Sequence, residues 1–347
     1  MLSFSKIKVV FIYIIFILIS LFAFLNLQNE NYPILNKKVN LGLDLQGGSY
    51  LLLEIDTKPL IKERIQSKVV PLKKLLNKNN FSYTNFIISS NRISLNFNNK
   101  DIKKFEKIFF SEKDNLLNSY IPKYNSFELD FKLVNNSIEI FFSKFGILNI
   151  NNLALSQSIE IVRRRIDDTG TKEPTILQRG DKRILVELPG IKDPERIKNL
   201  LGKTAQLNFR LVSDEKSEFG FDELISERGE KLIVNKRIIF SGENLVDAQP
   251  RMDNQTNQPI VSFTLDRLGS QRFGKSTLNN VGKRIAIVLD NQIISAPSIR
   301  EPITGGSGII SGDFSFQEAT DLALLLRSGA LPTPIEIVEE RTVGPDL

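Results

Sequence analysis

One apolar run near the N-terminus constrains this chain more strongly than any other feature. Residues 9–25 read VVFIYIIFILISLFAFL without a charge, and with their neighbours they are long enough to cross a hydrocarbon core at about 1.5 Å per residue. Lys6 and Lys8 precede the run, and Glu30 is the first charge after it. Because positive charge stays on the cytoplasmic side, we predict a cytoplasmic N-terminus and one transmembrane helix within residues 1–28.

A cleaved signal peptide is the alternative for this run. It would need a shorter apolar core and small residues at a cleavage site. Ala23 instead stands between Phe22 and Phe24, and residues 26–29 contain no A-x-A pattern. We therefore expect a retained anchor. Since no second run of this length follows in residues 28–347, we expect the chain to cross the membrane once.

Composition excludes several classes of chemistry. The 347 residues contain no Cys, His or Trp, which rules out Cys/His metal sites, disulfides and Cys or Ser/His nucleophilic dyads. Catalysis would have to rest on carboxylates, lysine or bound phosphate. We find no such site, and we expect a protein that is not an enzyme, with no catalytic residue, cofactor or metal. Residues 1–150 carry 20 basic and 12 acidic side chains, and residues 151–347 carry 26 and 28. No segment combines a dense basic face with aromatic residues, so we expect no nucleic-acid partner.

The remaining chain reads as an α+β protein. A glycine-rich turn feeds a strand in residues 41–56, and residues 57–149 form a looser α+β module in which we find no chemistry. After residue 149, apolar residues recur as on one face of a helix that Gly170 ends, at Leu155, Ile159, Val162 and Ile166. Short helices then alternate with strand pairs, which is typical of ferredoxin-like α/β sandwich units.

Helix caps and strand patterns place the later elements. Asp193 and the proline after it begin a short helix that Gly202 closes, and Ser315 opens a capping box for a helix over 316–327. Strands are expected at 175–177, 183–188, 207–212, 260–265, 285–289 and 335–338. The phrases NLLGKTAQLNFRLV and NNVGKRIAIVL share a helix–Gly-Lys–strand layout, which suggests two related units.

Residues 269–276 match the nucleotide-binding pattern G-x-x-x-x-G-K-[ST], and Asp290 follows an apolar strand as a magnesium-holding residue would. Three features oppose a phosphate-binding loop. The preceding strand alternates apolar and polar residues, whereas P-loop strands are buried on both faces. The following helix is short, and the chain turns back directly after Asp290. A P-loop nucleotide-binding protein stays open as an alternative, to be tested by nucleotide protection of Lys275.

Two further clusters have structural interpretations. Gly42, Gly47 and Gly48 suit a tight turn or a close backbone approach, and Asp44 suits a turn or capping carboxylate. The three arginines at 163–165 suit the solvated face of their helix, with the stems covering apolar surface.

Several phrases taken together resemble the SecD family of the bacterial Sec protein-export machinery. They are LGLDLQGGSYLLLEID, IVRRRIDDTGTKEPTI with RILVELPG, VGKRIAIVLDNQIISAPSIREPI, and LALLLRSGALPTPIEIVEERTVGP. The resemblance covers residues 1–56 and 150–347. It marks as family motif positions, with a structural or polypeptide-handling role, Gly42, Asp44, Gly47, Gly48, Arg164, Arg165, Asp168, Gly170, Pro189, Gly190, Gly344 and Pro345.

The resemblance implies a bacterial inner (plasma) membrane protein whose periplasmic domain has a ferredoxin-like base and an inserted head. Such a domain contacts unfolded secretory polypeptide emerging from the SecYEG channel and helps to complete its release, driven by the proton-motive force. The implied partners are SecF, SecYEG and a YajC-type subunit. The division would be a cytoplasmic N-terminus and anchor in 1–28, and a first periplasmic region in 29–149 with the base strand 41–56 and the α+β module. The base would follow in 150–212, the head in 213–312, and a return to the base with the start of the next membrane segment in 313–347. A periplasmic scaffold that only gathers other membrane proteins is a further alternative.

Two departures from the family pattern stand out. Gln46 occupies a place where the family often has arginine, and Asp346 follows a motif where a small polar residue is usual. The resemblance also implies further transmembrane helices, which carry proton coupling, after the point where this sequence stops. We therefore expect either a fragment or a division of the protein over two chains.

Overall fold

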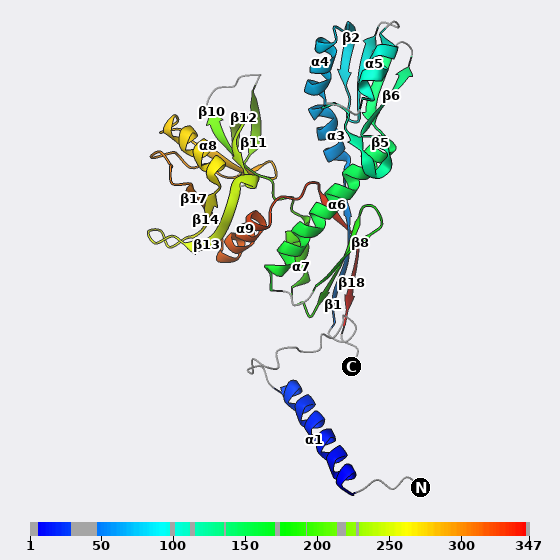
Figure 1. Ribbon diagram of the computed structural model, residues 1–347. Coiled ribbons are helices and arrows are strands. Elements are labelled where there is room, and N and C mark those ends of the chain that lie inside the picture. Colours follow the sequence, from blue (N-terminus) through cyan, green and yellow to red (C-terminus); the bar gives the residue numbers. More distant parts are fainter. Residues whose placement is uncertain are drawn as a thin grey trace, which may run out of the picture.

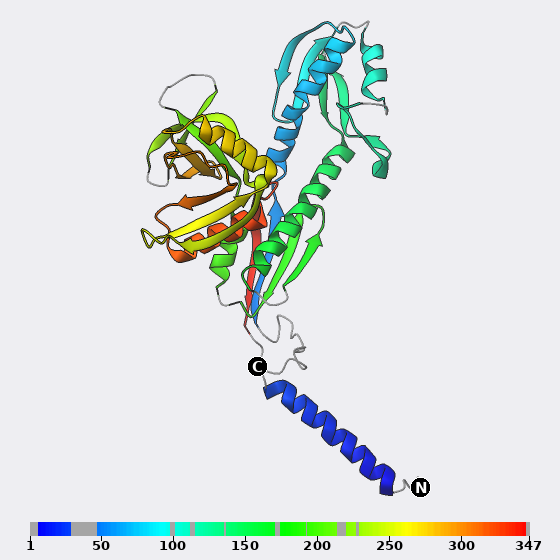
Figure 2. The same cartoon turned by 60° about the vertical axis from the view of Figure 1, so that its left-hand side comes forward.

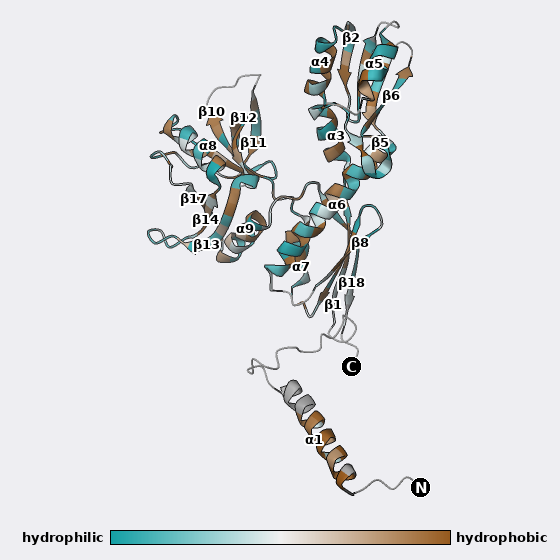
Figure 3. Ribbon diagram, viewed as in Figure 1, coloured by the Kyte–Doolittle hydropathy of each residue, from teal (hydrophilic) through white to brown (hydrophobic). Residues whose placement is uncertain are grey.

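The computed structural model describes residues 6–28, 47–97, 101–111, 115–134, 137–170, 174–191, 193–213, 220–226 and 229–344. Helix α1 (Lys6–Gln28) stands apart from three folded lobes (Figure 1). Its described large apolar side chains are exposed, with values from 38% at Val9 to 82% at Ile7, and the coloured part of the helix is largely apolar (Figure 3). Within the described residues, no helix is both long and apolar enough to cross a membrane.

The first lobe, which we call the base, is a four-stranded antiparallel sheet with helices on one face. Its strands stand in the order β18-β1-β9-β8, which together with the helix connections is the ferredoxin-like arrangement. β1 and β18 come from opposite ends of the chain and lie side by side (Figures 1 and 2). The elements of the base are β1 (Gly48–Ile55), α6 (Lys144–Asp167), β8 (Thr175–Arg179), β9 (Arg183–Pro189), α7 (Pro194–Gly202) and β18 (Ile335–Val343).

Helix α6 confirms the apolar stripe seen in the sequence. Leu155, Val162 and Ile166 are buried in the base core, and Gly170 adopts a φ of 77° just after the helix. The helix begins earlier than the stripe indicates, at Lys144, because the Ser143 hydroxyl accepts a hydrogen bond from the amide of Gly146. This longer helix continues from the base into the second lobe (Figure 1).

The second lobe is the α+β module. Its sheet has the order β2-β3-β7-β6, and its core is rich in phenylalanine, with Phe105 and Phe109 fully buried. Its elements are α3 (Lys58–Ser67), α4 (Val69–Lys78), β2 (Tyr83–Ile88), β3 (Arg92–Phe97), α5 (Ile102–Phe109), β4 (Tyr120–Ile121), η1 (Pro122–Tyr124), β5 (Ser126–Phe127), β6 (Leu129–Val134) and β7 (Ser137–Phe142).

The third lobe, which we call the head, contains two sheets that share its main hydrophobic core. A five-stranded sheet has the order β11-β12-β10-β15-β16, and a three-stranded sheet has the order β13-β14-β17. Its elements are β10 (Leu207–Ser213), β11 (Phe221–Ile225), β12 (Lys231–Ser241), η2 (Gly242–Asn244), β13 (Leu245–Met252), β14 (Pro259–Leu265), α8 (Arg267–Leu278), β15 (Ile285–Leu289), β16 (Gln292–Ser295) and β17 (Ser307–Ser311).

The head does not repeat the strand order of the base. The two phrases with a shared helix–Gly-Lys–strand layout end in β10 and β15, which are antiparallel neighbours in one sheet. Ser226 and Ile293 form a bridge between the two edges of the same sheet, so it curls around a second small core. Local similarity of the two phrases therefore marks two adjacent strands rather than two ferredoxin-like units.

Helix α9 (Phe316–Ser328) lies between head and base. Ser315 and Glu318 form the expected capping box. Ala319 and Leu322 pack into the head core, whereas Leu324 and Leu325 pack against Leu200 and Ala205 at the end of α7. Two ion pairs hold the same helix to the base, Arg196–Asp321 at 2.7 Å and Arg327–Asp168 at 2.8 Å.

Candidate functional site

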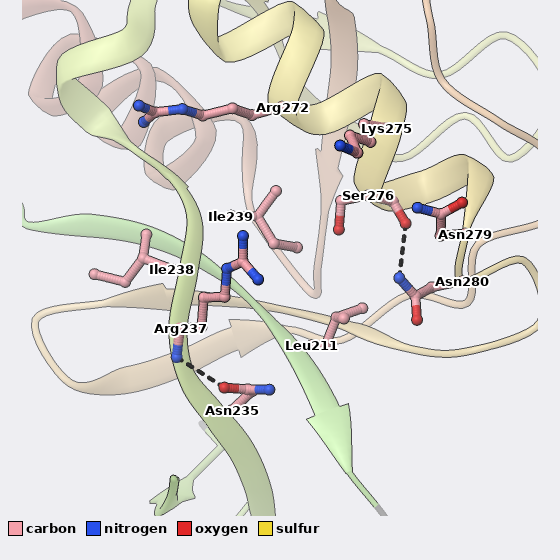
Figure 4. A pocket seen from close by; sticks show the side chains of 10 residues that line it. All are labelled: Leu211, Asn235, Arg237, Ile238, Ile239, Arg272, Lys275, Ser276, Asn279 and Asn280. Atoms are coloured by element: carbon pink, nitrogen blue, oxygen red, sulfur yellow. Dashed lines mark hydrogen bonds between the residues drawn. The ribbon is translucent and has the colours of Figure 1, made fainter.

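A cavity of about 540 Å³ opens in the head between α8 and β12. Figure 4 shows its lining, with Arg272, Lys275 and Ser276 coming from α8 and Arg237 and Ile238 coming from β12. The full lining is Leu211, Asn235, Arg237, Ile238, Ile239, Arg272, Lys275, Ser276, Asn279 and Asn280. This volume lies within the range of about 300–1,000 Å³ that is usual for ligand sites.

A bulge in β12 forms one wall of the cavity. Arg210 of β10 pairs with Ile238, and Val212 pairs with Val234, so two steps along β10 correspond to four along β12. Within the bulge, the Asn235 carboxamide oxygen accepts a hydrogen bond of 2.8 Å from the Arg237 amide. Because extra residues break the alternation of a strand, three consecutive side chains at 236–238 are exposed, and Ile238 faces the cavity at 42% exposure.

The opposite wall is the polar side of α8. Phe273 and Thr277 are buried on the other side of this helix, so Arg272, Lys275 and Asn279, at spacings of three and four, fall together on the solvent side. Thr277 is held in place because its hydroxyl donates to carbonyls of the preceding turn and accepts the amide of Ile303 at 2.9 Å. Packing of the buried side of α8 thereby holds the helix so that its polar side faces the cavity.

The nucleotide-binding pattern falls within α8 and does not form a loop. Asp266 is the N-cap of the helix, and its carboxylate accepts the amide of Gly269 at 2.6 Å. This hydrogen bond is the main cause that lowers the pKa of Asp266, with the Asn244 side chain and the charge of Arg272 acting in the same direction. A Cβ on Gly269 would approach the Asn244 Cβ to 2.8 Å, so close packing explains this glycine. The amide that would bind phosphate is occupied by a carboxylate of the same chain.

Asp290 is also held by hydrogen bonds within the chain. It lies in the left-handed region at a φ of 48°. Its carboxylate accepts from the Thr204 hydroxyl and from the amides of Ala205 and Gln206, at 2.5, 3.0 and 2.8 Å. It therefore ties the β15–β16 turn to the segment between α7 and β10 instead of facing the Lys275 side chain.

A second cavity of about 570 Å³ lies beside β16. Its apolar lining includes Leu232, Ile293 and Ile294, and its charged lining has both signs, with Arg284 near Glu230 at 3.7 Å. Ile294, which is a suitable position for cross-linking, therefore lines a cavity. Phe263 of β14 is only 3% exposed and belongs to the head core, so it is unsuitable as a probe of binding.

The family motif positions fall into two groups. Gly48 pairs with Pro189 on one side and with Val343 on the other, and the Gly190 amide donates to the Gly47 carbonyl at 2.9 Å. These glycines, with the adjacent Gly344, therefore meet at one end of the base sheet. Gly42, Asp44 and Pro345 lie outside the described residues.

The second group lies at the C-terminal end of α6, and it corrects the expectation for the arginine run. Arg164 is exposed, but Arg165 is fully buried. Its guanidinium donates to four backbone carbonyls at the junction of base and head, which are those of Leu200 in α7, of Lys203 and Thr204 after it, and of Gly329 after α9. Three consecutive arginines do not reveal which one points inward. That depends on how the helix is rotated relative to segments that are distant in the chain.

Burial of Arg165 has an electrostatic consequence. Burial lowers the pKa of the guanidinium to about 10, while the charge of Asp290 acts in the opposite direction. The side chain therefore stays charged at neutral pH. Charged hydrogen bonds to several carbonyls hold the α7–β10 connection and the end of α9 on one residue of the base.

Segments of this chain match models of known protein families. The model of the SecDF P1 head subdomain matches residues 217–333, that of the N-terminal P1 domain of protein translocase subunit SecDF matches 155–214, and that of the SecD/SecF GG motif matches 34–59. A crystal structure of SecDF in a super-membrane-facing form is similar with a TM-score of 0.52 and 26% identity, covering 98% of this chain and 35% of that one. The fold and the matched segments thus define a protein of the SecD/SecF class.

Curated relatives narrow the class to one family. Protein translocase subunit SecD of Rickettsia bellii is 41% identical over 318 residues, covering 89% of this chain and 59% of the relative. SecD of Acetobacter pasteurianus is 41% identical over 320 residues, covering 90% and 60%. The chain belongs to the SecD family. It spans about three fifths of the length of the curated relatives that it matches.

Proposed function

We propose that this chain is an accessory, non-enzymatic component of the Sec translocase. Its head binds unfolded preprotein as the preprotein emerges from the SecYEG channel, and this binding promotes completion and release of transport. The observation that carries the proposal is the cavity between α8 and β12. It has an aliphatic wall, and all its lining residues except Leu211 lie within the segment matched by the P1 head model. A site that accepts many sequences needs apolar surface and adaptable polar groups, and this lining offers both.

The membrane anchor is part of the proposal. Helix α1 begins with Lys6 and Lys8 and then carries the apolar run, which supports a cytoplasmic N-terminus and a periplasmic base, module and head in a bacterial inner membrane. The chain has no Cys, so a single introduced cysteine reports topology. In intact spheroplasts, Gln178→Cys should react with an impermeant maleimide, whereas Ser3→Cys should react only after lysis. Labelling of both before lysis would contradict the anchor.

The proposed partners are SecF, the SecYEG channel and a YajC-type subunit, with energy from the proton-motive force in the full complex. We assign proton transfer to no residue of this chain. Co-purification from detergent-solubilised membranes tests the partners. Recovery with SecF and SecYEG supports the proposal, and recovery only with unrelated membrane proteins would support the scaffold alternative.

Site-specific cross-linking tests polypeptide binding directly. A photoreactive residue at Ile238 or Ile294 should capture a stalled secretory chain, because these positions line the two cavities of the head. Leu133, which is 53% exposed in the α+β module, is the matched control. Silence at both head positions, with the chain still bound to the channel, would contradict polypeptide binding and leave a scaffold.

We propose a structural role for the family motif positions. The glycines at the end of the base sheet allow close pairing and positive φ, with Gly47 at 67° and Gly190 at 62°, and Asp168 pairs with Arg327 of α9. Substitutions there are expected to disturb the base or its junction with the head rather than the cavity itself.

A further inference from the structure

The charges around the cavity between α8 and β12 have one sign. Arg237, Arg272 and Lys275 line it, and no described lining residue is acidic. None of the three side chains forms an ion pair or a side-chain hydrogen bond with the described residues. Asp266, whose pKa Arg272 helps to lower, is already bound to the amide of Gly269.

The other cations on the strands of the five-stranded head sheet are paired with carboxylates, whereas the three that line the cavity are not paired with any described carboxylate. Arg210 and Lys236 share Asp222 at 2.8 and 3.6 Å, and Lys231 lies 3.1 Å from Glu223. Three like charges without acidic partners raise the local potential and attract anions. Since the cavity is partly enclosed, a carboxylate that enters it is screened less than one on an open surface.

The rest of the lining selects the kind of anion. Leu211, Ile238 and Ile239 provide an aliphatic wall next to the cations. No aromatic side chain among the described lining residues offers a surface for stacking a nucleobase. The cavity meets the side of α8 and not its N-terminus, which Asp266 caps, so it lacks the row of free amides that cradles phosphate.

Amide side chains complete the site. The carboxamide of Asn280 donates to the Ser276 carbonyl at 2.9 Å, whereas the Asn279 side chain has no hydrogen bond to the described residues. Such a group can bond to a peptide backbone, which presents both donors and acceptors. The volume of about 540 Å³ suits a few extended residues and excludes a folded partner.

We propose that this cavity binds segments of extended polypeptide in which Asp or Glu stands next to aliphatic residues. The proposal rests on the proposed function and adds a preference to it. The carboxylates meet Arg237, Arg272 and Lys275, and the neighbouring aliphatic side chains cover the wall of Leu211, Ile238 and Ile239. Charge thereby makes some stretches of a translocating chain bind more tightly than others.

Matched peptides test the preference on the full chain in detergent micelles. One fluorescent peptide carries Glu beside Leu, and its partner differs only by Gln in place of each Glu. We expect the acidic peptide to bind about tenfold more tightly at low salt, with the difference falling as salt rises. The double variant Arg272→Gln with Lys275→Gln should remove this difference without weakening binding of the neutral peptide. Lys283→Gln, an exposed cation of the head outside the cavity, should leave it intact.

The outcomes separate this preference from polypeptide binding itself. Equal binding of the two peptides, with cross-linking at Ile238 retained, would overturn the preference and leave the proposed function standing. Failure of both peptides, together with silent cross-linking, would overturn both. If phosphatidylglycerol vesicles, but neither peptide, bind in a manner that depends on Arg272 and Lys275, the occupant is a lipid headgroup and the proposal is wrong.

Discussion

Replacement of Arg165 by methionine tests the junction between base and head. The guanidinium donates to the carbonyls of Leu200 and Lys203 at 2.7 and 2.5 Å, and to two further carbonyls at 3.3 and 3.2 Å. Thr204 keeps the amide of Leu331 at 2.8 Å as a second donor. Methionine therefore leaves three carbonyls without their charged partner, one in buried and two in partly buried surroundings.

The expected magnitude follows from two opposing effects. Each buried carbonyl that loses its donor costs about 1–3 kcal/mol, which gives about 3–9 kcal/mol in total. Burial lowers the pKa of Arg165 to about 10, and relief of this burial returns about 3 kcal/mol. Because water enters the space and satisfies part of the freed carbonyls, we expect Arg165→Met to lower the free energy of unfolding by about 3 kcal/mol.

Denaturant unfolding of the full chain in micelles, followed by circular dichroism, measures this loss. Hydrogen exchange should rise in the segments 200–206 and 329–331, which the guanidinium connects. Arg164→Met is the matched control, because Arg164 is exposed on the same helix, and it should stay within about 0.5 kcal/mol of the parent. Equal stability of the Arg165 and Arg164 variants would refute this account of the junction.

Three further predictions concern local features. Ser315→Ala should cost about 1 kcal/mol and raise hydrogen exchange in the first turn of α9, and unchanged exchange there would contradict the capping box. Asp266 has a lowered pKa, so its contribution is present above its ordinary pKa and is lost as pH falls through the folded value; Asp266→Asn should lower the melting temperature at neutral pH, with a difference from the parent that disappears in acid. A Cβ on Gly146 would overlap the carbonyl oxygen of Glu128, so Gly146→Ala should destabilise the protein by about 1–3 kcal/mol, whereas Gly202→Ala, with nothing within 4 Å, should be neutral or slightly stabilising in the same thermal melts.

Local patterns in the sequence predict local structure well here. The stripe over α6, the N-cap at Asp193 and the capping box at Ser315 are confirmed. Each depends on residues within about four positions, whose spacing follows from helix geometry alone. The argument against a nucleotide loop is confirmed only in part. The alternation before residue 266 is visible without the fold, but the short helix expected from Lys275 to Gly282 instead begins at Arg267 and contains the pattern.

The strand order of the base sheet is less accessible from local patterns than the helix caps are. Its strand order brings β1 beside β18 across almost the whole chain, which no local pattern specifies. The family resemblance implies a ferredoxin-like base, which has this order, but it also assigns the strand at 207–212 to the base, whereas the structure shows this strand as β10 of the head sheet. The strand order of the head is not predicted from the sequence. The two similar phrases, which suggest a repeat, contain neighbouring strands of one sheet.

The sequence by itself determines the apolar N-terminal run, the absence of Cys and His, the helix caps and the family. Only the tertiary structure decides the site. The bulge at 235–237 is defined only by the register between β12 and β10, and the inward position of Arg165 depends on carbonyls as far away as Gly329, 164 residues later. Contacts of this range reflect how separate elements pack together, and a pattern confined to a few neighbouring residues carries no information about them.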